Sequence, residues 1–549
     1  MTRVVEAAPS APERSRPGRT VVLDGSGLTL DDVTAVARDG ARVVLSDDPR
    51  VRAPMAASRA LRDDALRRGI PIYGVTTGFG DSVHRQIAPG KARELQAHLV
   101  RNLGCGTGAL APVDVARATV LIRANSLARG HSGVRVELVE RLLDLLNAGI
   151  VPLIPEEGSV GASGDLVPLS YVAAVVTGTR DVLFRGEVRP AAEAFRQVGL
   201  DPLVLEPKEA LSLVNGTAFM TAFAALAVTD ARRVARAADT CTALAVEVLN
   251  GIAGPFTAFI HDVAKPHPGQ VRSAANIRRM LEGSGLARGY DEVVDEAGAL
   301  DGGGYRELTV HIQDRYSLRC APHFVGVLWD TLEWVERWLT TEINSTNDNP
   351  LFDVDTGGIR SGGNFSGGHV ALAMDALRTA VASVADLLDR QLELVVDEKF
   401  NNELTPNLIA RLPAGHAEEG LNHGFKGMQL ACSSLTADAL SRCMPTTVFS
   451  RSTECHNQDK VSMGTTAARH TRDVVALTEK VAAIHLLALC QAADLRGADR
   501  LGRTRAVFDR IRARVPFVGV DREMAADIAQ VVELLHDDSL TETFDRLAG

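Results

Sequence analysis

The stretch GASGDLVP at residues 161–168 decides how the rest of the chain is interpreted. It overlaps a glycine-rich segment from Gly158 to Asp165, and repeated glycine permits backbone angles and close approaches that other residues resist. A bare Ala-Ser-Gly triplet occurs often by chance, and its simplest interpretation is a turn in which Asp165 caps the helix that follows. The longer stretch is far more specific, so its meaning depends on the segments that accompany it.

Further polar or glycine-rich segments accompany this stretch along the chain. Each has a plain structural interpretation when taken alone: a packed loop tyrosine, an asparagine satisfied within a helix turn, an ion-paired arginine or a polar helix end. None of them indicates a function by itself. The segments are Tyr73–Gly80 (YGVTTGFG), Leu213–Thr217 (LVNGT), Gln313–Arg319 (QDRYSLR), Asn344–Pro350 (NSTNDNP), Gly363–Phe365 (GNF) and Asn457–Gly464 (NQDKVSMG).

The composition favours a large helical protein and excludes nucleic-acid binding. The chain has 549 residues, of which 46% are hydrophobic but only 4% aromatic. An aliphatic core of this kind suits close-packed helices. The formal net charge is -10, which argues against a nucleic-acid partner because such binding needs a basic surface.

The cysteine pattern and the N-terminus predict a reduced, cytoplasmic protein. The seven cysteines are widely spaced and include no CxxC pair, so we expect no metal site and no disulfide framework. Residues 1–19 lack the apolar core of a signal peptide, and their Pro, Ala, Ser and Arg content predicts a disordered leader. No stretch is long and apolar enough to span a membrane.

Apolar periodicity predicts the fold class and the domain organisation. Apolar residues recur at spacings of three and four, which predicts long helices over 208–250, 323–344, 369–399 and 466–495. Short apolar runs at 20–23 and 43–45 are typical of small strands. The expected fold is mainly α, with a bundle of long antiparallel helices. Its expected parts are a disordered leader (1–19), a smaller N-terminal α-rich domain with a mobile inner loop (20–206), a central long-helix bundle (207–500) and short C-terminal helices (501–549).

In the order and content of its motifs the chain resembles the histidine, phenylalanine and tyrosine ammonia-lyases and the related 2,3-aminomutases. In that family the triplet, here Ala162, Ser163 and Gly164, cyclises with loss of two waters into 4-methylidene-imidazol-5-one (MIO), without an external cofactor. Gly164 would present its amide nitrogen to the Ala162 carbonyl in a compressed backbone that a side chain would obstruct. Ser163 would lose its hydroxyl to leave the electrophilic methylene. The resemblance also implies the helical fold of the fumarase and aspartase superfamily, with the MIO loop in the N-terminal domain.

The resemblance assigns roles to the accompanying segments. Tyr73 is the expected base for the β-proton, and because a free tyrosine titrates at about 10, its phenolate needs stabilisation. Arg319 is the expected clamp for the substrate carboxylate, since a guanidinium can form two parallel hydrogen bonds with it. Asn215 and Tyr316 are expected beside the electrophile. The remaining expected substrate contacts are Leu103, Gly104, Gln313, Asn347 at the carboxylate, Phe365 near the electrophile and Gln458 at the amino group.

Two positions favour phenylalanine as the substrate. Histidine lyases carry Glu where Gln458 stands, and a neutral Gln lacks the charge that would favour an imidazole. Tyrosine and histidine enzymes usually carry His where Leu103 stands, and Leu cannot hydrogen-bond a phenol, whereas an apolar pocket accepts a phenyl ring with no hydroxyl left unpaired. Two alternatives stay open: Leu103 as an ordinary core residue, and His98, about one helical turn away, as a substitute for the missing histidine.

Several positions near the expected pocket depart from the family pattern. They keep other aryl substrates open, including a non-standard amino acid of secondary metabolism. Ser366 and Gly368 replace the His and Gln of NFHGQ, Ala218 and Phe219 replace a small pair after NGT, and Glu454, Cys455 and His456 precede NQD where small polar residues are common.

Three hypotheses for the function follow. The first is an ammonia-lyase that converts L-phenylalanine or a close analogue into trans-cinnamate and ammonia. The second is a 2,3-aminomutase that re-adds the amine to give β-phenylalanine or β-tyrosine; the two differ in how tightly the inner loop, about 73–89, holds the product. The third is a catalytically inactive helical scaffold, against which the intact triplet and Tyr73 argue. For the enzymes, the resemblance implies a small aromatic amino acid as substrate and a homotetramer in which each active site uses segments from three chains.

Overall fold

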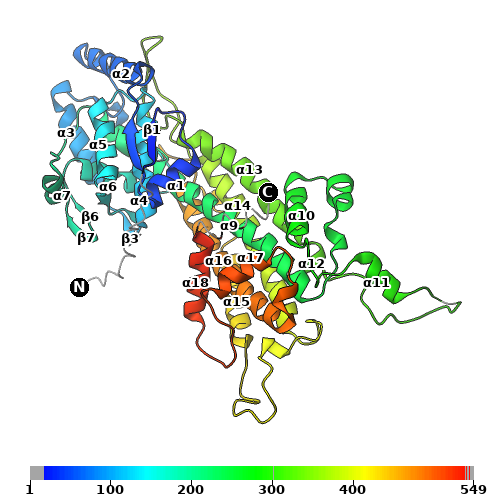
Figure 1. Cartoon of the computed structure of the whole chain (residues 1–549). Coiled ribbons are helices and arrows are strands. Elements are labelled where there is room, and N and C mark those ends of the chain that lie inside the picture. The colour runs from blue at the N-terminus through cyan, green and yellow to red at the C-terminus, as the bar shows by residue number, and fades with distance from the viewer. Residues whose placement is uncertain (1–17, 301, 538–539, 541–542, 544–549) are drawn as a thin grey trace. The chain divides into compact units, whose positions relative to one another are not determined.

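The computed structural model describes residues 18–300, 302–537, 540 and 543, and helices dominate it (Figure 1). The longest are α9 (Ala218–Val248), α13 (Ala321–Ile343), α14 (Gly368–Val396) and α16 (Gly464–Arg496). Each coincides with an apolar stretch from which the sequence predicts a long helix, because apolar residues at three- and four-residue spacing form a continuous face for packing. The mainly α fold class is confirmed. Among the described residues, no helix combines the length and apolarity needed to cross a membrane.

The remaining elements are short. The shorter α-helices are α1 (Leu30–Arg38), α2 (Pro49–Arg67), α3 (Ala92–Asn102), α4 (Val113–Ala128), α5 (Val136–Asn147), α6 (Leu166–Val176), α7 (Ala191–Val198), α8 (Glu209–Val214), α10 (Pro268–Met280), α11 (Tyr290–Ala297), α12 (Tyr316–Arg319), α15 (Lys426–Ser441), α17 (Arg505–Arg512) and α18 (Ala525–His536). The strands are β1 (Thr20–Leu23), β2 (Arg42–Leu45), β3 (Thr107–Leu110), β4 (Val151–Pro152), β5 (Pro155–Glu157), β6 (Asp181–Phe184), β7 (Glu187–Pro190), β8 (Leu351–Asp353) and β9 (Gly358–Arg360). The pair β1–β2 is parallel, as the two apolar runs allow, and β3–β5, β4–β6–β7 and β8–β9 are antiparallel.

The chain forms two compact units, each assembled from separate segments. The first comprises Met1–Thr229, Val335–Asp375 and Pro445–Arg472, and the second comprises Asp230–Trp334, Ala376–Met444 and Asp473–Gly549. Most of the expected leader, residues 1–17, lies outside the described residues. The division into parts that follow one another along the chain stays a prediction, and the interleaved units are the compact bodies that the structure shows.

The core of the first unit is built around α4. This helix packs against α1 and α5, and Figure 1 shows all three in the blue-to-cyan part of the chain. Every residue of α4 from position 118 to its end is buried. A helix that is buried on all sides is normally apolar throughout, yet α4 carries Arg123 and Asn125 there. These two polar residues therefore need internal partners.

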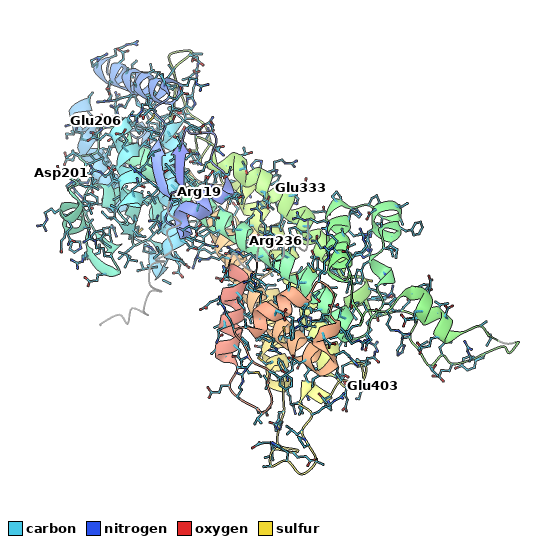
Figure 2. All side chains as sticks on the ribbon, in the orientation of Figure 1. Arg19, Asp201, Glu206, Arg236, Glu333 and Glu403 are labelled. Carbon is cyan, nitrogen blue, oxygen red and sulfur yellow. The ribbon has the colours of Figure 1, made fainter. Side chains whose placement is uncertain are left out.

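Buried and partly buried charges anchor the segment that leads into α8. Glu206, labelled in Figure 2, accepts a hydrogen bond from Arg62 of α2 (2.9 Å). Lys208 is fully buried and donates to the carboxylate of Asp348 (2.7 Å), which ties the start of α8 to the segment after α13. α8 then ends, and a break at 215–217 separates it from α9. The sequence predicts one or two helices over 208–250, and the structure has two.

Buried polar residues inside the second unit make hydrogen bonds to one another. Asp239 of α9 accepts hydrogen bonds from Asn276 (2.8 Å) and from the Trp329 ring (3.1 Å). Burial raises the pKa of Asp239 to about 6, although these hydrogen bonds oppose the rise. His485 of α16 contacts Gln391 of α14 (3.2 Å), and burial lowers its pKa to about 3, so it is neutral at physiological pH. These groups hold the core of this unit together.

Candidate active site

The GASGDLVP stretch forms a tight loop that needs glycine at two positions. Gly161 and Gly164 have φ angles of 66° and 70°, where residues with a Cβ are strained. A Cβ on Gly164 would lie 2.0 Å from the carbonyl oxygen of Gly216. The amide of Asp165 donates to that same oxygen (2.7 Å), so the loop lies directly against the break between α8 and α9. A side chain at position 164 would prevent this approach.

Asp165 joins the loop to two long helices. Its carboxylate accepts hydrogen bonds from the amide of Met220 (2.8 Å), the hydroxyl of Ser159 (2.9 Å) and the hydroxyl of Thr465. The Met220 amide belongs to the first turn of α9, where N–H groups lack partners within the helix. The interpretation that Asp165 caps the helix directly after it is wrong, because its side chain makes no capping bond to α6. Burial raises the pKa of Asp165 to about 6, against the lowering effect of its hydrogen bonds.

Two residues expected in the active site hold Ser163 from different sides. The Nδ2 of Asn215 donates to the Ser163 carbonyl oxygen (2.9 Å), and the Nε2 of Gln458 donates to its Oγ (3.1 Å). Thr453 orients Gln458 by donating to its Oε1 (2.9 Å). The Oδ1 of Asn215 is buried and has no hydrogen-bond partner among the described residues. Because buried polar atoms are normally satisfied, this oxygen is free to accept a hydrogen bond from a bound molecule.

Asn347 lies beneath the same break, and its side chain is already partly engaged. It is 1% exposed, and its Nδ2 donates to the hydroxyl of Thr217 (2.8 Å). Its Oδ1 accepts hydrogen bonds from Arg123 Nη1 (3.1 Å) and Ser126 Oγ (3.2 Å). The amide oxygen therefore serves the protein interior. The Asn347 side chain also forms a hydrogen bond with the Glu342 carboxylate, so in this conformation both ends of its amide serve the protein interior.

Tyr73 begins the inner loop, which folds as a small hairpin. The amide of Gly78 donates to the carbonyl of Arg85 (2.9 Å), and the amide of Ile87 donates to the carbonyl of Thr76 (2.8 Å). A short 3-10 helix, Gly80–His84, lies between these bonds at the tip. The loop thus has backbone pairing of its own.

The phenol of Tyr73 is folded against this hairpin. Its hydroxyl accepts a hydrogen bond from the amide of Gly80 (2.8 Å). Gln96 of α3, which is fully buried, donates to the carbonyl of Gly74 (3.0 Å) and accepts from the amide of Leu211 (3.1 Å). One side chain therefore fixes the start of the inner loop to α8.

A second contact to the inner loop comes from the turn before the NQD motif. Both carboxylate oxygens of Glu454 accept the amide N–H of Asp81 (2.9 and 3.0 Å). Glu454, Cys455 and His456 have φ angles of 52°, 52° and 63°, a strained left-handed turn for three residues that are not glycine. Burial raises the pKa of the Tyr73 phenol, the hydrogen bond from the loop amide lowers it, and the nearby charge of Glu454 raises it. In this conformation the phenol holds its proton.

Leu103 and Gly104 follow the last turn of α3. The hydroxyl of Ser170, in α6, donates to the carbonyl of Leu103 (3.2 Å), which places this corner beside the helix that follows the triplet. A Cβ on Gly104 would lie 1.9 Å from the guanidinium of Arg180, so glycine leaves room for that side chain. Phe365 is half-buried in the segment before α14. The first unit thus contains these expected site residues: Tyr73, Leu103, Gly104, Ala162, Ser163, Gly164, Asn215, Asn347, Phe365 and Gln458.

The other three expected site residues belong to the second unit. Gln313 and Tyr316 are exposed, Tyr316 to 70%. Arg319 stacks on the Tyr316 ring, with its Cζ 4.6 Å from the ring centre, and its Nε donates to the carbonyl of Asp314 (2.9 Å). The Asp314 carboxylate accepts the amide of Ile252 instead (2.7 Å). Because the terminal nitrogens of Arg319 make no hydrogen bond within the described part of the chain, its fork can receive a carboxylate.

Comparison with known proteins shows which family this chain resembles. Residues 28–513 match the family described as aromatic amino acid lyase. A tyrosine ammonia-lyase of Cupriavidus metallidurans is 42% identical over 526 residues, which is 95% of this chain and 97% of that protein. The chain belongs to the aromatic amino acid lyase family.

Aminomutases of known structure are also similar to this member of the aromatic amino acid lyase family. A tyrosine aminomutase from Streptomyces globisporus superposes with a TM-score of 0.89 at 38% identity, over 96% of this chain and 98% of that chain. The phenylalanine aminomutase of Pantoea agglomerans also gives 0.89, at 35% identity over 95% and 100%. These neighbours confirm the fumarase- and aspartase-like helical fold. The family makes the chain an enzyme of carbon–nitrogen bond chemistry on aromatic amino acids, and the names of its relatives span both lyase and mutase.

Enzymes of the aromatic amino acid lyase family form MIO from their own chain, without an external cofactor. The residues present here fit that group. The triplet Ala162, Ser163 and Gly164 is intact, and position 164 has both the backbone angle and the crowding that only glycine tolerates. The Ser163 carbonyl oxygen, which would be the exocyclic oxygen of the ring after cyclisation, already accepts a hydrogen bond from Asn215.

Several residues that organise this lyase-family site have no signal in the sequence that identifies their role. Arg123, Gln96 and Thr465 bond to loops or residues of the site, yet none of them belongs to a motif. The signal for Arg123 is a charged residue in a mostly apolar stretch of helix. Ser159 lies in the glycine-rich segment and bonds to Asp165, six residues along the chain, but nothing in that segment distinguishes it. Gln96 and Thr465 lie far in sequence from their partners, and nothing local indicates them.

One group of side chains outside the site has the composition of a metal site. Asp230, Glu479 and His536 lie close together in the second unit. Arg233 donates to Asp230, and its Nη1 lies 3.0 Å from the Nδ1 of His536. A guanidinium among these groups neutralises the carboxylates, so an ion-pair network accounts for the cluster.

Proposed function

We propose that the chain is an MIO-dependent ammonia-lyase that eliminates ammonia from L-phenylalanine, or a close aryl analogue, to give trans-cinnamate. The observation that carries the proposal is the placement of Ser163 between Asn215 and Gln458, in a loop that leaves no room for a side chain at Gly164. A half-buried serine with a purely structural role would not require the crowding found at Gly164.

The side chains around the triplet are suited to a reaction at this point. When formed, the MIO group would supply an electrophilic methylene that is conjugated with the oxygen contributed by Ser163. Asn215 holds an N–H donor 2.9 Å from that oxygen, and a donor fixed in advance stabilises developing charge. Gln458 lies 3.1 Å from the Ser163 Oγ, the atom lost on cyclisation, so its amide is placed to orient the substrate amino group.

Tyr73 and Arg319 complete the proposed chemistry. Tyr73 removes the β-proton, and its loop closes over the reacting atoms and excludes water. Arg319 holds the substrate carboxylate with its two free terminal nitrogens and so fixes which hydrogen faces the base. Tyr316, on which Arg319 stacks, keeps the guanidinium in place.

We expect Glu454→Gln to move the rising limb of kcat against pH to lower pH. Tyr73 acts as a base only when it is ionised, and a raised pKa leaves less phenolate at any given pH. The negative charge of Glu454 contributes to that raised pKa. Gln removes the charge but still accepts the Asp81 amide, so the pKa should fall and activity should appear at lower pH. The measurement is kcat across roughly pH 6 to 11.

The matched control for this variant is Glu94→Gln, which removes a carboxylate from the exposed face of α3. Its pH profile should superimpose on that of the unmodified enzyme. Identical rising limbs for the Glu454→Gln variant and the unmodified enzyme would show that Glu454 does not influence the base.

Leu103→His should shift the preference from phenylalanine towards tyrosine. A histidine at this corner can hydrogen-bond a phenol, whereas Leu103 leaves the hydroxyl of tyrosine without a partner. The ratio of kcat/KM for tyrosine over phenylalanine should rise at least about tenfold, equivalent to about 1.4 kcal/mol. Ala97→His, six residues earlier and within α3, supplies the matched control. If the two variants have equal ratios, Leu103 does not line the ring pocket.

A 2,3-aminomutase is the second candidate. The observation in its favour is the inner loop, which has its own backbone pairing and is fastened by Gln96 and Glu454. A loop that opens slowly would retain the acrylate and ammonia long enough for the amine to add at the β-carbon. Chiral LC–MS after incubation with L-phenylalanine, L-tyrosine and L-histidine together separates the candidates. Cinnamate alone supports the lyase, a β-amino acid supports the mutase, and coumarate contradicts the interpretation of Leu103.

The proposed assembly is a cytoplasmic homotetramer with shared active sites. The residues expected in one site divide between the two compact units, with Arg319 and Tyr316 in the second. Segments contributed by three chains, as in the family, would bring such groups together. Light scattering on the purified protein should give four times the chain mass; a monomer with full activity would contradict the shared site. An inactive scaffold, the remaining hypothesis, requires an intact mass without the loss of two waters.

A further inference from the structure

Arg123 is a buried cation that has no hydrogen-bonded carboxylate among the described residues. It is completely buried in the middle of α4. The nearby negative charge that acts on it is Asp348, but that carboxylate already accepts hydrogen bonds from Lys208 (2.7 Å) and Ser132 (2.9 Å). Burial lowers the pKa of Arg123, yet a guanidinium stays charged at physiological pH. Placing an unpaired charge in a core is unfavourable unless other groups compensate for it.

The compensating groups are residues of the active site. The Nη1 of Arg123 donates to the backbone carbonyl of Asn215 (2.9 Å) and to the side-chain oxygen of Asn347 (3.1 Å). Its Nη2 donates to the hydroxyl of Ser126 (3.1 Å), which in turn donates to the same Asn347 oxygen. A Cβ on Gly216 would lie 1.9 Å from Nη1, so glycine there admits the guanidinium. Arg123 thus joins two segments that lie far apart in the sequence.

The orientation of the Asn215 side chain depends on its backbone. Its Nδ2 donates to the Ser163 carbonyl, but its Oδ1 has no partner in the described part of the chain, so the side chain is fastened at one end only. The backbone carbonyls of Asn215 and Gly216 are each fixed, the first by Arg123 and the second by the Asp165 amide (2.7 Å). These two bonds determine the direction from which the Asn215 amide approaches Ser163.

We propose that Arg123 is a positioning residue for the reaction, which aligns the Asn215 N–H with the Ser163 oxygen and places a fixed positive charge behind it. The inference rests on the proposed lyase or mutase function. Arg123 does not touch the substrate; it acts through Asn215 and Asn347. A fixed donor and a fixed charge stabilise negative charge that develops in the transition state, and they contribute little to ground-state binding.

Two substitutions separate the hydrogen bonds from the charge. Arg123→Lys keeps the charge but cannot reach Asn215, Asn347 and Ser126 together, and Arg123→Gln removes the charge. The matched control is Arg117→Gln, also in α4, because Arg117 donates only to backbone carbonyls of Val36 and Leu146, outside the active site. For each variant we would measure the intact mass, the melting temperature, the Kd for cinnamate by calorimetry, and kcat and KM.

The proposal predicts a selective loss of kcat. With the two waters lost as in the unmodified chain, Arg123→Lys should lower kcat at least about tenfold and Arg123→Gln about a hundredfold, while KM and the Kd for cinnamate change less than about threefold. Arg117→Gln should keep kcat within about twofold, even if its melting temperature falls as far as those of the Arg123 variants. If Arg123→Gln does not fold, Ser126→Ala tests the same contact, with an expected loss of about threefold in kcat.

Two outcomes would overturn the proposal. Unchanged kcat in the mature Arg123 variants, with only a lower melting temperature, would make Arg123 a purely structural residue. Variants that fold but keep both waters would assign Arg123 to formation of the electrophile instead of to the reaction. Failure of the proposed function itself looks different: the unmodified chain would keep both waters and convert none of the aromatic amino acids.

Discussion

Ser163→Ala is expected to abolish turnover while leaving the protein folded. Ser163 is the only residue of the triplet whose side chain contributes the electrophilic carbon, so no other group replaces it. We expect kcat to fall at least about 10⁴-fold, which corresponds to a loss of about 5.5 kcal/mol of transition-state stabilisation. The structural effect should be small, because Ser163 is half-buried and the Oγ that alanine lacks is also lost when the electrophile forms.

Mass spectrometry distinguishes this result from misfolding. The unmodified chain should be lighter than its sequence mass by two waters, and the Ser163→Ala chain should match its sequence mass. Ser170→Ala is the matched control, because Ser170 lies one turn into α6 and its hydroxyl bonds only the carbonyls of Leu103 and Val167. That control should retain the loss of two waters and most of its activity. Full activity in Ser163→Ala would remove the basis for an MIO electrophile.

The elements that can be predicted from the sequence are those whose determining residues lie within the element itself. Long apolar periodicity predicts α13, α14 and α16 to within a few residues, because a helix that buries one face must repeat it at every turn. For 208–250 it predicts one or two helices, and it does not give the break that places the start of α9 at Ala218. The glycine at position 164 was predictable for a similar reason, since its requirement lies in the backbone next to Ser163. The structure adds the cause of that requirement, the carbonyl of Gly216 at 2.0 Å from any Cβ.

Residues that act over long sequence distances were not predictable. Asp165 suggested a cap for the helix directly after it, but its partner is the first turn of α9, more than fifty residues along the chain. Arg123 lies in α4, and the apolar pattern of this helix predicts only that it is buried. The role of Arg123 depends on its hydrogen bonds to Asn215 and Asn347. A pattern in one segment carries no information about which distant segment will pack on it, so such pairs emerge only from the fold.

The charges that surround Tyr73 could not be predicted from the sequence either, because they come from a distant segment. The sequence identifies the residue and indicates that its phenolate needs stabilisation. The structure shows a neighbouring carboxylate, Glu454, at one of the positions that depart from the family pattern. In the conformation seen here, burial and that charge keep the proton on the phenol. Ionisation of Tyr73 therefore has to accompany a change in its surroundings.

Tyr73→Phe is expected to lower kcat by about 10³, within the range of about 10²–10⁴ typical of a lost general base. The ring still fills its half-buried position, so KM should change little and the loss of two waters should persist. The rising limb of the pH profile should disappear, since no phenol remains to ionise. The Gly80 amide also loses its acceptor, which loosens the loop by about 1 kcal/mol.

Thr77→Val distinguishes the effect of a loosened loop on kcat from the effect of losing the base. It removes the hydroxyl that accepts the Gly74 amide (3.1 Å) and keeps the Tyr73 phenol. Tryptic cleavage after Arg85, at the side of the hairpin, should accelerate to a similar extent in both variants. If the phenol is the base, only Tyr73→Phe should lose about three orders of magnitude in kcat. Equal losses in both variants would mean that Tyr73 matters for loop closure alone and that the base lies elsewhere.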